Sequence, residues 1–288
     1  MPVQPSNTRS PAAGGGGNGS AAWHPSVVAE LAEVVGNTAV NAEYRHLVVA
    51  CGPEAAQAQP GQFFQLLCPH SGDDQPFLRR PMSVYGADPD KRQVEFLYKV
   101  TGAGTRGLAA LEPGYRLDLM GPLGSGFRLD PAWRHIVAVG RGAGLATLAP
   151  LAKAAHRADI HVTAVLSARR PQLVVSDDLF RSYGADVIVV TDSESTSGPA
   201  NVERILRRLI SEGRCAAFFT CGSSRLTQVQ QKLAREFALP GQVAMEQQMA
   251  CGLGLCFCCV RDFNIDGDIV HRRVCWDGPV FDLMEALP

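Results

Sequence analysis

The sequence has little of several features, and each shortage excludes a class of protein. No stretch approaches the roughly 18 consecutive apolar residues that a membrane-spanning helix requires, and the first residues show no apolar core of a secretory signal. The 28 acidic and 27 basic residues leave a formal net charge of −1, so no single-sign field is present to attract nucleic acid. We therefore expect a cytoplasmic globular protein that binds neither a membrane nor nucleic acid.

The chain is long enough for two or three folded units. Its 288 residues are 46% hydrophobic, which allows a sizeable core. Residues 1–26 stand apart because they open with MPVQPSNTRSPAAGGGGNGSAA, which is rich in Gly, Pro and small polar residues. Such a composition buries too little apolar area to offset the entropy of ordering, so we expect a disordered leader.

Residues 27–129 carry short β-type runs separated by turn signals. Five or six strands at this spacing predict a small antiparallel β-barrel. The runs are YRHLVVAC, GQFFQLLC, RRPMSVYG, QVEFLYKV and YRLDLMGP.

Residues 130–240 change to apolar strands that alternate with amphipathic helices. HIVAVG precedes LATLAPLAKAAHR, DVIVVT precedes NVERILRRLISEG, and CAAFFTCG precedes SRLTQVQQKLAREF. This alternation predicts a doubly wound α/β domain with a parallel sheet. Residues 241–288 follow neither pattern and form a third, C-terminal segment.

That last segment is crowded with cysteine. It holds five of the nine cysteines, four of them in MACGLGLCFCCV and the fifth in RRVCWDGPV. A reducing cytoplasm disfavours disulfides and makes clustered thiols more consistent with metal binding or redox chemistry. Cys251, Cys256 and Cys259 have the spacing C-x4-C-x2-C and Cys275 follows at a distance, which is the plant-type ligand pattern of a [2Fe–2S] cluster.

Two alternatives to the cluster stay open. A structural zinc site would normally show repeated C-x2-4-C pairs, and here only one compact group has that spacing. Unligated buried cysteines are the other alternative. Gly252 and Gly254 favour the cluster, because amide N–H groups can approach cluster sulfurs where no Cβ intervenes; Cys258 would then be a spare thiol.

Three glycine-bearing stretches could bind nucleotide phosphates, although each taken singly is also compatible with a plain turn. LYKVTGAGTRGL can lead into a helix whose backbone N–H groups cradle a diphosphate. VAVGRGAGLATLAPL places Gly140, Gly142 and Gly144 between an apolar strand and a helix. FFTCGSSRL places Cys221 and Gly222 at the end of a later strand, and the carboxyl ends of such strands line the ligand crevice of an open α/β sheet.

These motifs, in this order, resemble the ferredoxin–NAD(P) reductase superfamily. Within it they are most similar to the electron-transfer subunit of NAD-dependent dihydroorotate dehydrogenases, over about residues 28–288. The most specific part is EQQMACGLGLCFCCV with VCWDGPVFDLMEAL. The resemblance implies bound FAD, a [2Fe–2S] cluster and NAD(H), and a catalytic partner subunit, FMN-containing in the dihydroorotate case, in a hetero-oligomer.

The resemblance also implies site residues. RRPMSVYG matches the Arg-Pro-x-Ser motif of the superfamily, in which Arg80 would meet the FAD diphosphate and Ser83 the reactive edge of the flavin. The implied FAD residues are Arg80, Pro81, Met82, Ser83, Leu97, Lys99, Gly104 and Thr105. The implied nicotinamide residues are Gly140, Gly142, Gly144, Cys221 and Gly222, and the implied metal ligands are Cys251, Cys256, Cys259 and Cys275.

The nicotinamide loop departs from the pattern of the superfamily. That loop commonly reads Gly-Gly-Gly-Ile-Gly with a proline soon after, whereas this chain has Arg141, Ala143 and Thr147 at the corresponding places. Ser223 follows Cys221-Gly222 where relatives usually have proline. The expectation for NAD(H) therefore rests on fewer matching residues than those for FAD and the cluster.

The main functional hypothesis is a flavoprotein that passes electrons between a partner oxidoreductase and NAD(H). One alternative is an NAD(P)H-dependent reductase that feeds another oxidoreductase or an oxygenase. A second alternative is a non-catalytic scaffold that carries only a bound metal.

Overall fold

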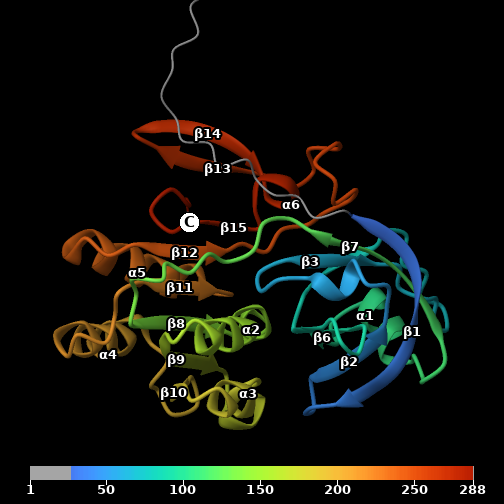
Figure 1. The fold of residues 1–288 in the computed structure, drawn as a ribbon, viewed down its shortest axis with the longest axis horizontal. Helices are drawn as coiled ribbons and strands as arrows, with labels where there is room; N and C mark the ends of the chain where they lie inside the picture. Colours follow the sequence, from blue (N-terminus) through green and yellow to red (C-terminus); the bar gives the residue numbers. More distant parts are fainter. Residues whose placement is uncertain (1–26, 288) are drawn as a thin grey trace, which may run out of the picture.

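The computed structural model describes residues 27–287 and contains two sheets and a small C-terminal unit (Figure 1). The expected leader, residues 1–26, lies outside the described residues. No helix in residues 27–287 is long and apolar enough to cross a membrane. The predicted fold class, an antiparallel barrel-like domain followed by a parallel α/β domain, is confirmed.

The first sheet is antiparallel and curls around its own core (Figure 1). In spatial order its strands are β4 (Arg80–Ser83), β3 (Phe63–Leu66), β7 (Arg116–Leu123), β1 (Val28–Ala39), β2 (Tyr44–Ala50), β6 (Gln93–Lys99) and β5 (Gly86–Asp88). Alternate residues point inward, so that Leu47, Phe64 and Phe96 are fully buried. The short helices η1 (Ala55–Gln57) and α1 (Ala103–Ala109) connect strands of this sheet.

The sheet has seven strands, more than the five or six expected. The sequence runs named above contain β2, β3, β4, β6 and β7, but neither β1 nor β5. Strand β1 is long, yet its polar residues and its half-buried positions make the alternation weak. Strand β5 has only three residues, too few for a periodic signal.

The second sheet has five parallel strands and one antiparallel strand at its edge. In order these are β10 (Asp186–Thr191), β9 (His161–Ala168), β8 (His135–Arg141), β11 (Phe218–Cys221), β12 (Gly241–Ala244) and β15 (Val280–Asp282). Helices α2 (Gly144–Arg157) and α3 (Asp177–Ser182) pack on one face, whereas α4 (Pro199–Ser211) and α5 (Ser224–Phe237) pack on the other. The 3-10 helix η2 (Pro171–Leu173) follows β9.

The strands of this sheet are apolar on both faces because helices cover both. Val137 and Val139 of β8 face the core that contains α4 and α5, and Ile136 and Ala138 face the core that contains α2. Such continuous apolar runs are typical of buried parallel strands, which is why the sequence identified them readily.

The C-terminal segment closes over both sheets (Figure 1). Strands β13 (Val260–Ile265) and β14 (Asp268–Arg273) form a hairpin, and helix α6 (Val274–Asp277) follows. Asp266 and Gly267 both have positive φ in the hairpin turn, as the Asp-Gly pair favours. Residues 241–288 also supply β12 and β15 to the α/β sheet, so that sheet extends beyond residue 240.

Candidate functional site

The structure brings the clustered cysteines together in two pairs of thiols. The sulfurs of Cys259 and Cys275 lie 3.1 Å apart, although the two residues belong to different segments. The thiol of Cys256 is hydrogen-bonded to the sulfur of Cys251. All nine cysteines are free of disulfides.

Backbone amides surround these sulfurs. The N–H of Leu253 donates to Sγ of Cys251 at 3.3 Å, and the N–H of Gly254 donates to Sγ of Cys275 at 3.2 Å. Burial raises the pKa of the Cys251 thiol, but hydrogen bonds from the amides of Leu253, Cys256 and Leu255 and from the Cys256 thiol outweigh it and lower the pKa to about 7. Amides aimed at sulfur stabilise thiolates and cluster sulfurs, so the loop fits a cluster held by thiolates.

Two glycines allow the loop to wrap this closely. Gly252 and Gly254 have φ of +72° and +74°. A Cβ on Gly252 would lie 2.8 Å from Cγ of Gln65 in β3, and a Cβ on Gly254 would lie 2.9 Å from Cβ of Trp276. The loop is therefore packed against the first sheet and against α6, and only glycine fits at these two positions.

Cys258 occupies a different position from the other thiols of its loop. It is exposed, and its Sγ points toward the carbonyl oxygen of Gln248, 3.9 Å away. It takes no part in the hydrogen bonds that join the two thiol pairs.

A cavity of about 350 Å³ lies between the two sheets. Six residues of the implied FAD set line it: Pro81, Met82, Ser83, Leu97, Lys99 and Thr105. Residues from α2 and from the segment 245–249 line the opposite side. The cavity thus contacts both sheets and the beginning of the C-terminal segment.

The remaining two residues of that set lie together beside the cavity. A Cβ on Gly104 would be 3.0 Å from Cγ and Nε of Arg80, so the arginine passes directly over the start of α1. The Thr105 hydroxyl oxygen accepts hydrogen bonds from the amides of Thr101 and Gly102, at 2.8 and 3.0 Å, and so fixes that turn. The arrangement leaves a cationic side chain next to a glycine-bearing turn, which suits a diphosphate.

The glycines of the predicted nicotinamide site are required by close backbone packing. A Cβ on Gly144 would lie 2.5 Å from the carbonyl carbon and oxygen of Cys221. Gly222 has φ of +89°, and its Cβ would lie 2.3 Å from the carbonyl oxygen of Arg141. The β8–α2 turn and the β11–α5 turn therefore touch, as expected for two loops at the carboxyl edge of one sheet.

A second cavity, of about 270 Å³, opens at this edge. Gly142 and Gly222 line it, together with Arg141, Glu43 and Glu246. Gly140 lies behind it in the core, where its Cβ would clash with Leu145 and Leu148 of α2. Cys221 is also buried there, and burial raises the pKa of its thiol.

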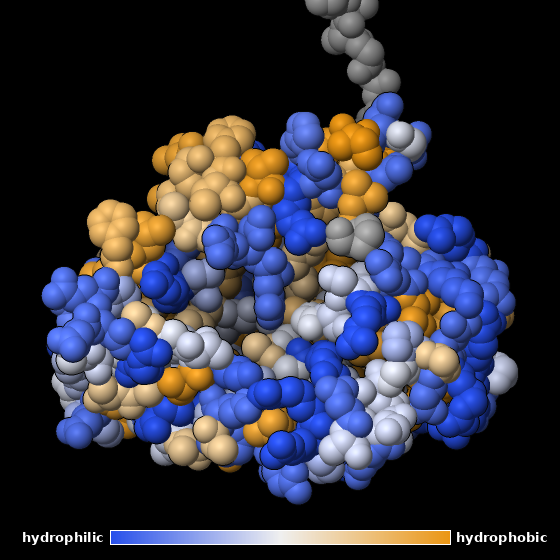
Figure 2. Space-filling view, turned by 180° about the vertical axis from the view of Figure 1, so that it is seen from behind, coloured by the Kyte–Doolittle hydropathy of each residue, from blue (hydrophilic) through white to orange (hydrophobic). Residues whose placement is uncertain are grey.

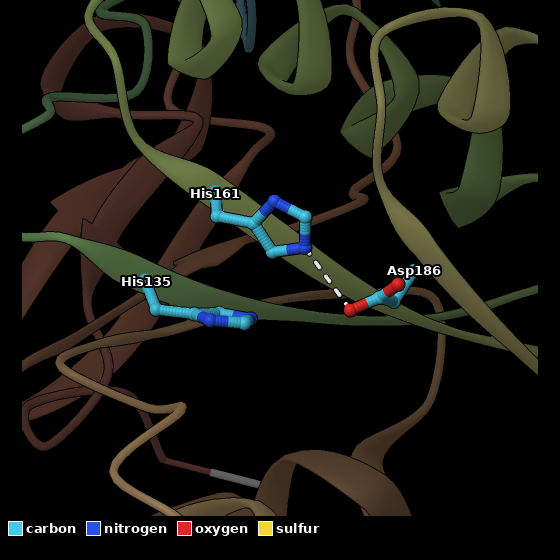
Figure 3. Close-up of side chains that lie close together, drawn as sticks. All are labelled: His135, His161 and Asp186. Atoms are coloured by element: carbon cyan, nitrogen blue, oxygen red, sulfur yellow. Dashed lines mark hydrogen bonds and ion pairs between the residues drawn. The ribbon is translucent and has the colours of Figure 1, made fainter.

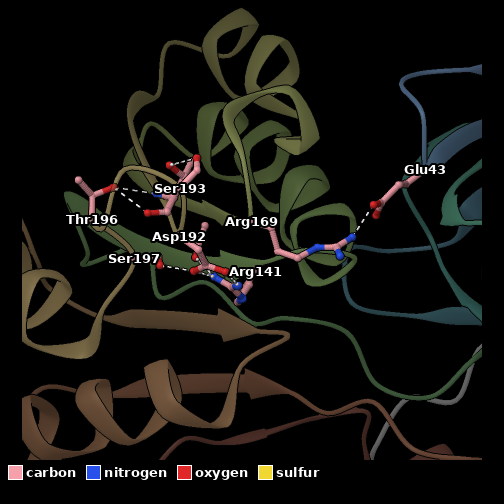
Figure 4. Close-up of polar contacts among 9 residues, drawn as sticks. Glu43, Arg141, Arg169, Asp192, Ser193, Thr196 and Ser197 are labelled. Carbon is pink, nitrogen blue, oxygen red and sulfur yellow. Dashed lines mark hydrogen bonds and ion pairs between the residues drawn. The ribbon is translucent and has the colours of Figure 1, made fainter.

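Sequence reasoning missed Glu43, Arg169 and Asp192 around this second cavity, and it missed the ion pairs that they make with Arg141 and Lys99. Arg141 makes a bidentate ion pair with Asp192 at the end of β10, and Arg169 at the end of β9 pairs with Glu43 (Figure 4). Lys99 also binds Glu43, at 2.8 Å. These residues lie in connections at strand ends, where no periodic pattern marks them; only their position after apolar strands could have identified Arg141, Arg169 and Asp192.

Another polar cluster lies at the opposite, amino-terminal edge of the same sheet (Figure 3). His135, His161 and Asp186 are the first residues of β8, β9 and β10. His161 Nε2 lies 3.0 Å from Asp186 Oδ2, and Arg214 also pairs with that carboxylate. Burial and, to a smaller extent, the charge of His161 lower the pKa of His135 to about 4.

Apolar side chains gather on the surface of the C-terminal segment, at the top of the molecule in Figure 2. Leu255 is 76% exposed and Phe257 is 62% exposed, and both belong to the loop that carries the clustered cysteines. Contiguous exposed apolar side chains, unlike single ones, often mark a surface that meets a partner.

Known proteins match the C-terminal segment and, more broadly, about four fifths of the chain. The family model for the iron–sulfur cluster binding domain of dihydroorotate dehydrogenase B matches residues 246–286. The electron transfer subunit of dihydroorotate dehydrogenase B (NAD(+)) from Desulforamulus reducens is 32% identical over 230 residues, covering 80% of this chain and 87% of the relative. The same subunit from Bacillus caldolyticus is 34% identical over 236 residues, covering 80% of this chain and 87% of the relative.

Solved structures extend the comparison to the fold. A chain of the NADH-dependent reduced ferredoxin–NADP oxidoreductase superposes with a TM-score of 0.74 at 27% identity, over 88% of this chain and 89% of that one. The ferredoxin reductase of carbazole 1,9a-dioxygenase superposes with a TM-score of 0.59 at 22% identity, over 74% of this chain and 67% of that one. The second match shows a shared fold alone.

Proposed function

The chain belongs to the family of electron transfer subunits of NAD-dependent dihydroorotate dehydrogenase B, and we propose that it carries electrons between NAD(H) and a catalytic partner subunit. The observation that carries this proposal is the placement of the cysteine loop. Its four paired thiols lie in a loop that packs against β3 and α6, and the 350 Å³ cavity between the sheets reaches the segment that leads into the loop.

FAD and the cluster supply the redox chemistry when bound, since flavin exchanges electron pairs with NAD(H) and single electrons with iron–sulfur groups. The work of this chain is to bind and orient them. In our proposal Arg80 holds the FAD diphosphate over the turn that contains Gly104 and Thr105. Pro81, Met82, Leu97 and Lys99 enclose the flavin, and Ser83 offers a hydroxyl to its reactive edge.

The nicotinamide nucleotide would enter from the other side of the flavin cavity. We assign its binding to the touching turns that contain Gly140, Gly142, Gly144, Cys221 and Gly222. Because Gly144 and Gly222 allow those turns to approach within van der Waals distance, the backbone at the sheet edge is fixed before the nucleotide arrives.

We propose that Cys251, Cys256, Cys259 and Cys275 hold the cluster. The amides of Leu253 and Gly254, which donate to the sulfurs of Cys251 and Cys275, would favour the anionic form that ligation requires. Cys258, which points toward Gln248, would remain unligated. A division into residues 27–129 for FAD, 130–240 for NAD(H) and 241–288 for the cluster follows from these assignments, with β12 and β15 attaching the third part to the second.

The partner subunit is expected to bind at the cluster end of the molecule. Leu255 and Phe257 form an exposed apolar surface on the loop that would hold the cluster. Electrons must cross between the two subunits near this loop, and burial of these side chains would favour a stable hetero-oligomer. A cytoplasmic location is a further proposal, supported by nine cysteines without a disulfide.

A second candidate function is a reductase that sends electrons from a nicotinamide nucleotide to a different oxidoreductase. The similarity to a chain of NADH-dependent reduced ferredoxin–NADP oxidoreductase favours it. The two candidates share all bound groups and differ in the partner. Electron transfer to NAD⁺ upon addition of dihydroorotate and an FMN-containing partner subunit would favour the first.

The decisive test is the visible absorption spectrum of anaerobically purified protein while NADH is added stepwise. Flavin and iron–sulfur bands that bleach with NADH are the expected result. Bands that bleach with dithionite but not with NADH would contradict nicotinamide use and leave the flavin and cluster assignments intact. A protein that retains no flavin after gentle purification would contradict the FAD assignment and favour the scaffold alternative.

A further inference from the structure

Arg141 occupies a position where the superfamily commonly has glycine. Its side chain joins neighbouring strands at the carboxyl edge of the α/β sheet. Its Nη1 donates to Oγ of Ser167 at 2.8 Å and to Oδ1 of Asp192 at 3.1 Å. Its Nη2 donates to Oδ2 of Asp192 at 2.6 Å. One guanidinium thus bridges the ends of three neighbouring strands, β8, β9 and β10, and Figure 4 shows its ion pair with Asp192.

These hydrogen bonds leave one edge of the Arg141 guanidinium available. An arginine has five N–H donors, and the contacts above use three of them. The Nε hydrogen and the second Nη2 hydrogen have no acceptor in residues 27–287, and they lie side by side on one edge of the planar group. Two parallel N–H donors of this kind match a phosphate bidentately.

The orientation of this edge is fixed by its partners. Asp192 receives both terminal nitrogens and also accepts a hydrogen bond from the Ser197 hydroxyl. The hydrogen bond from Arg141 and, to a smaller extent, the one from Ser197 hold the pKa of Asp192 below its usual range. The carboxylate is therefore charged at neutral pH. The side chain of Arg141 is only 20% exposed, and little freedom remains to be lost when a ligand binds.

Charged side chains of both signs surround Arg141 at this edge of the sheet. Arg141 lines the 270 Å³ cavity with Gly142 and Gly222, the two glycines with positive φ at the touching turns. Three cations, Arg141, Arg169 and Lys99, face three carboxylates there, those of Asp192, Glu43 and Glu246. In a site that contains both cations and carboxyl groups, directed N–H donors distinguish one anionic group from another better than the summed charge does.

We propose that Arg141 binds the diphosphate of the nicotinamide nucleotide through its Nε–Nη2 edge, with Asp192 as its positioning residue. This inference rests on the proposed function, because it deepens the nicotinamide site. It also gives a physical reason for the departure of this loop from Gly-Gly-Gly-Ile-Gly. In this chain the Arg141 side chain makes a contact that the backbone makes in a glycine-rich loop.

The test compares ligands with and without a diphosphate on the oxidised holoprotein. Calorimetry would give the Kd of NAD⁺, ADP-ribose and adenosine for the unmodified protein and for Arg141→Gly, Arg141→Lys and Arg157→Ala. We expect Arg141→Gly to raise the Kd of NAD⁺ and ADP-ribose about 10- to 100-fold, the usual loss for a charge-assisted bidentate contact. The Kd of adenosine should stay within about twofold, since no phosphate is involved.

Two variants separate the effect of the two parallel N–H donors from the effect of the positive charge. Arg141→Lys should recover little affinity, because an ammonium keeps the charge but not the two parallel donors. Arg157→Ala removes a charge from the exposed C-terminal end of α2 and should leave all three Kd values unchanged. Unchanged flavin and iron–sulfur absorption in each variant would show that the protein has folded and retains both groups.

Asp192→Ala tests the positioning role. It should weaken ADP-ribose binding in the unmodified background but have no further effect in Arg141→Gly, because the residue to be positioned is then gone. An equal effect in both backgrounds would overturn that role. ADP-ribose binding that is unaffected by Arg141→Gly would overturn the inference alone, whereas an unmodified protein that binds neither NAD⁺ nor ADP-ribose would overturn the nicotinamide function with it.

Discussion

Thr147 on α2 donates a hydrogen bond to the Oγ of Ser83 on β4, with a distance of 3.0 Å between the two oxygens. This contact joins the α/β sheet to the curled antiparallel sheet at the wall of the flavin cavity. Since the Ser83 oxygen accepts, the Ser83 hydrogen is left to point elsewhere, and the cavity is the polar opening available to it. Thr147 therefore orients the hydroxyl that we assign to the reactive edge of the flavin.

Removal of the Thr147 hydroxyl should slow electron transfer without loss of flavin. Thr147→Val keeps the shape but deletes a net interaction of about 0.5–1.5 kcal/mol, so reduction of bound FAD by NADH should slow about 2- to 10-fold. Rapid-mixing absorption measures this rate. Thr147→Ser restores the donor and should restore the rate; a rate that follows side-chain size instead would contradict the orienting role.

The ligand assignment predicts opposite results for two neighbouring cysteines. Cys256→Ser should abolish the iron–sulfur absorption bands, because Cys256 pairs with Cys251 in the proposed ligand set. Cys258→Ser should leave the bands intact, because that thiol points toward Gln248. Iron and sulfide content with the visible spectrum would decide; if Cys258→Ser is the damaging change, the assignment is wrong.

The diphosphate assignment for FAD can be tested with two adjacent arginines. Arg79 binds the Asp118 carboxylate at 2.8 Å, whereas Arg80 crosses the turn at Gly104. Arg80→Ala should weaken FAD retention about 10- to 100-fold, the usual loss for a charge-assisted phosphate contact. Flavin released during gel filtration measures the loss. Arg79→Ala is the matched control, and equal release by both variants would indicate a general loss of positive charge.

Close backbone packing makes Gly144 sensitive to a single methyl group. Its Cβ would lie 2.5 Å from the Cys221 carbonyl group, which is backbone and cannot move aside cheaply. Gly144→Ala should therefore lower the free energy of unfolding by about 1–3 kcal/mol and impair reduction by NADH. Gly198→Ala, at a glycine with open space around it, should be close to neutral in both urea unfolding and NADH titration.

Much of this architecture could be predicted because its signals are local. The apolar runs of β8 and β11 and the glycines after β8 identified the α/β sheet and the edge at which its loops meet. The C-x4-C-x2-C spacing identified the cysteine loop in the same way, since ligand spacing is a property of one short segment.

Contacts between distant segments could not be predicted. Glu43 lies before β2, yet it binds Lys99 of β6 and Arg169, which directly follows β9 of the other sheet. No periodicity marks such residues, because each is exposed in its own segment and acquires a partner only when the two sheets come together. Arg141 was predicted only as a departure from a pattern; the partner that gives it a role, Asp192, lies 51 residues away.

The His135 cluster predicts a loss of stability in mild acid. His135 Nε2 lies 2.8 Å from the Thr163 hydroxyl, and its ring packs edge-on against His161 at 4.6 Å between centroids. Burial and the charges of His161 and Arg214 lower its pKa to about 4, against the opposing effect of Asp186. The unfolded chain, with a histidine pKa of about 6.5, binds a proton first as the pH falls.

Between about pH 6.5 and 4 the unfolded chain therefore holds one more proton at this position than the folded protein does. The free energy of unfolding should decrease as the pH falls through that window. Asp186, whose pKa is lowered chiefly by its hydrogen bond to His161, loses its contribution only at pH values below its ordinary range. His135→Gln should flatten the decrease measured by urea unfolding at pH 7 and pH 5, while the exposed His70→Gln keeps it. A slope that survives His135→Gln would assign the acid sensitivity to another group.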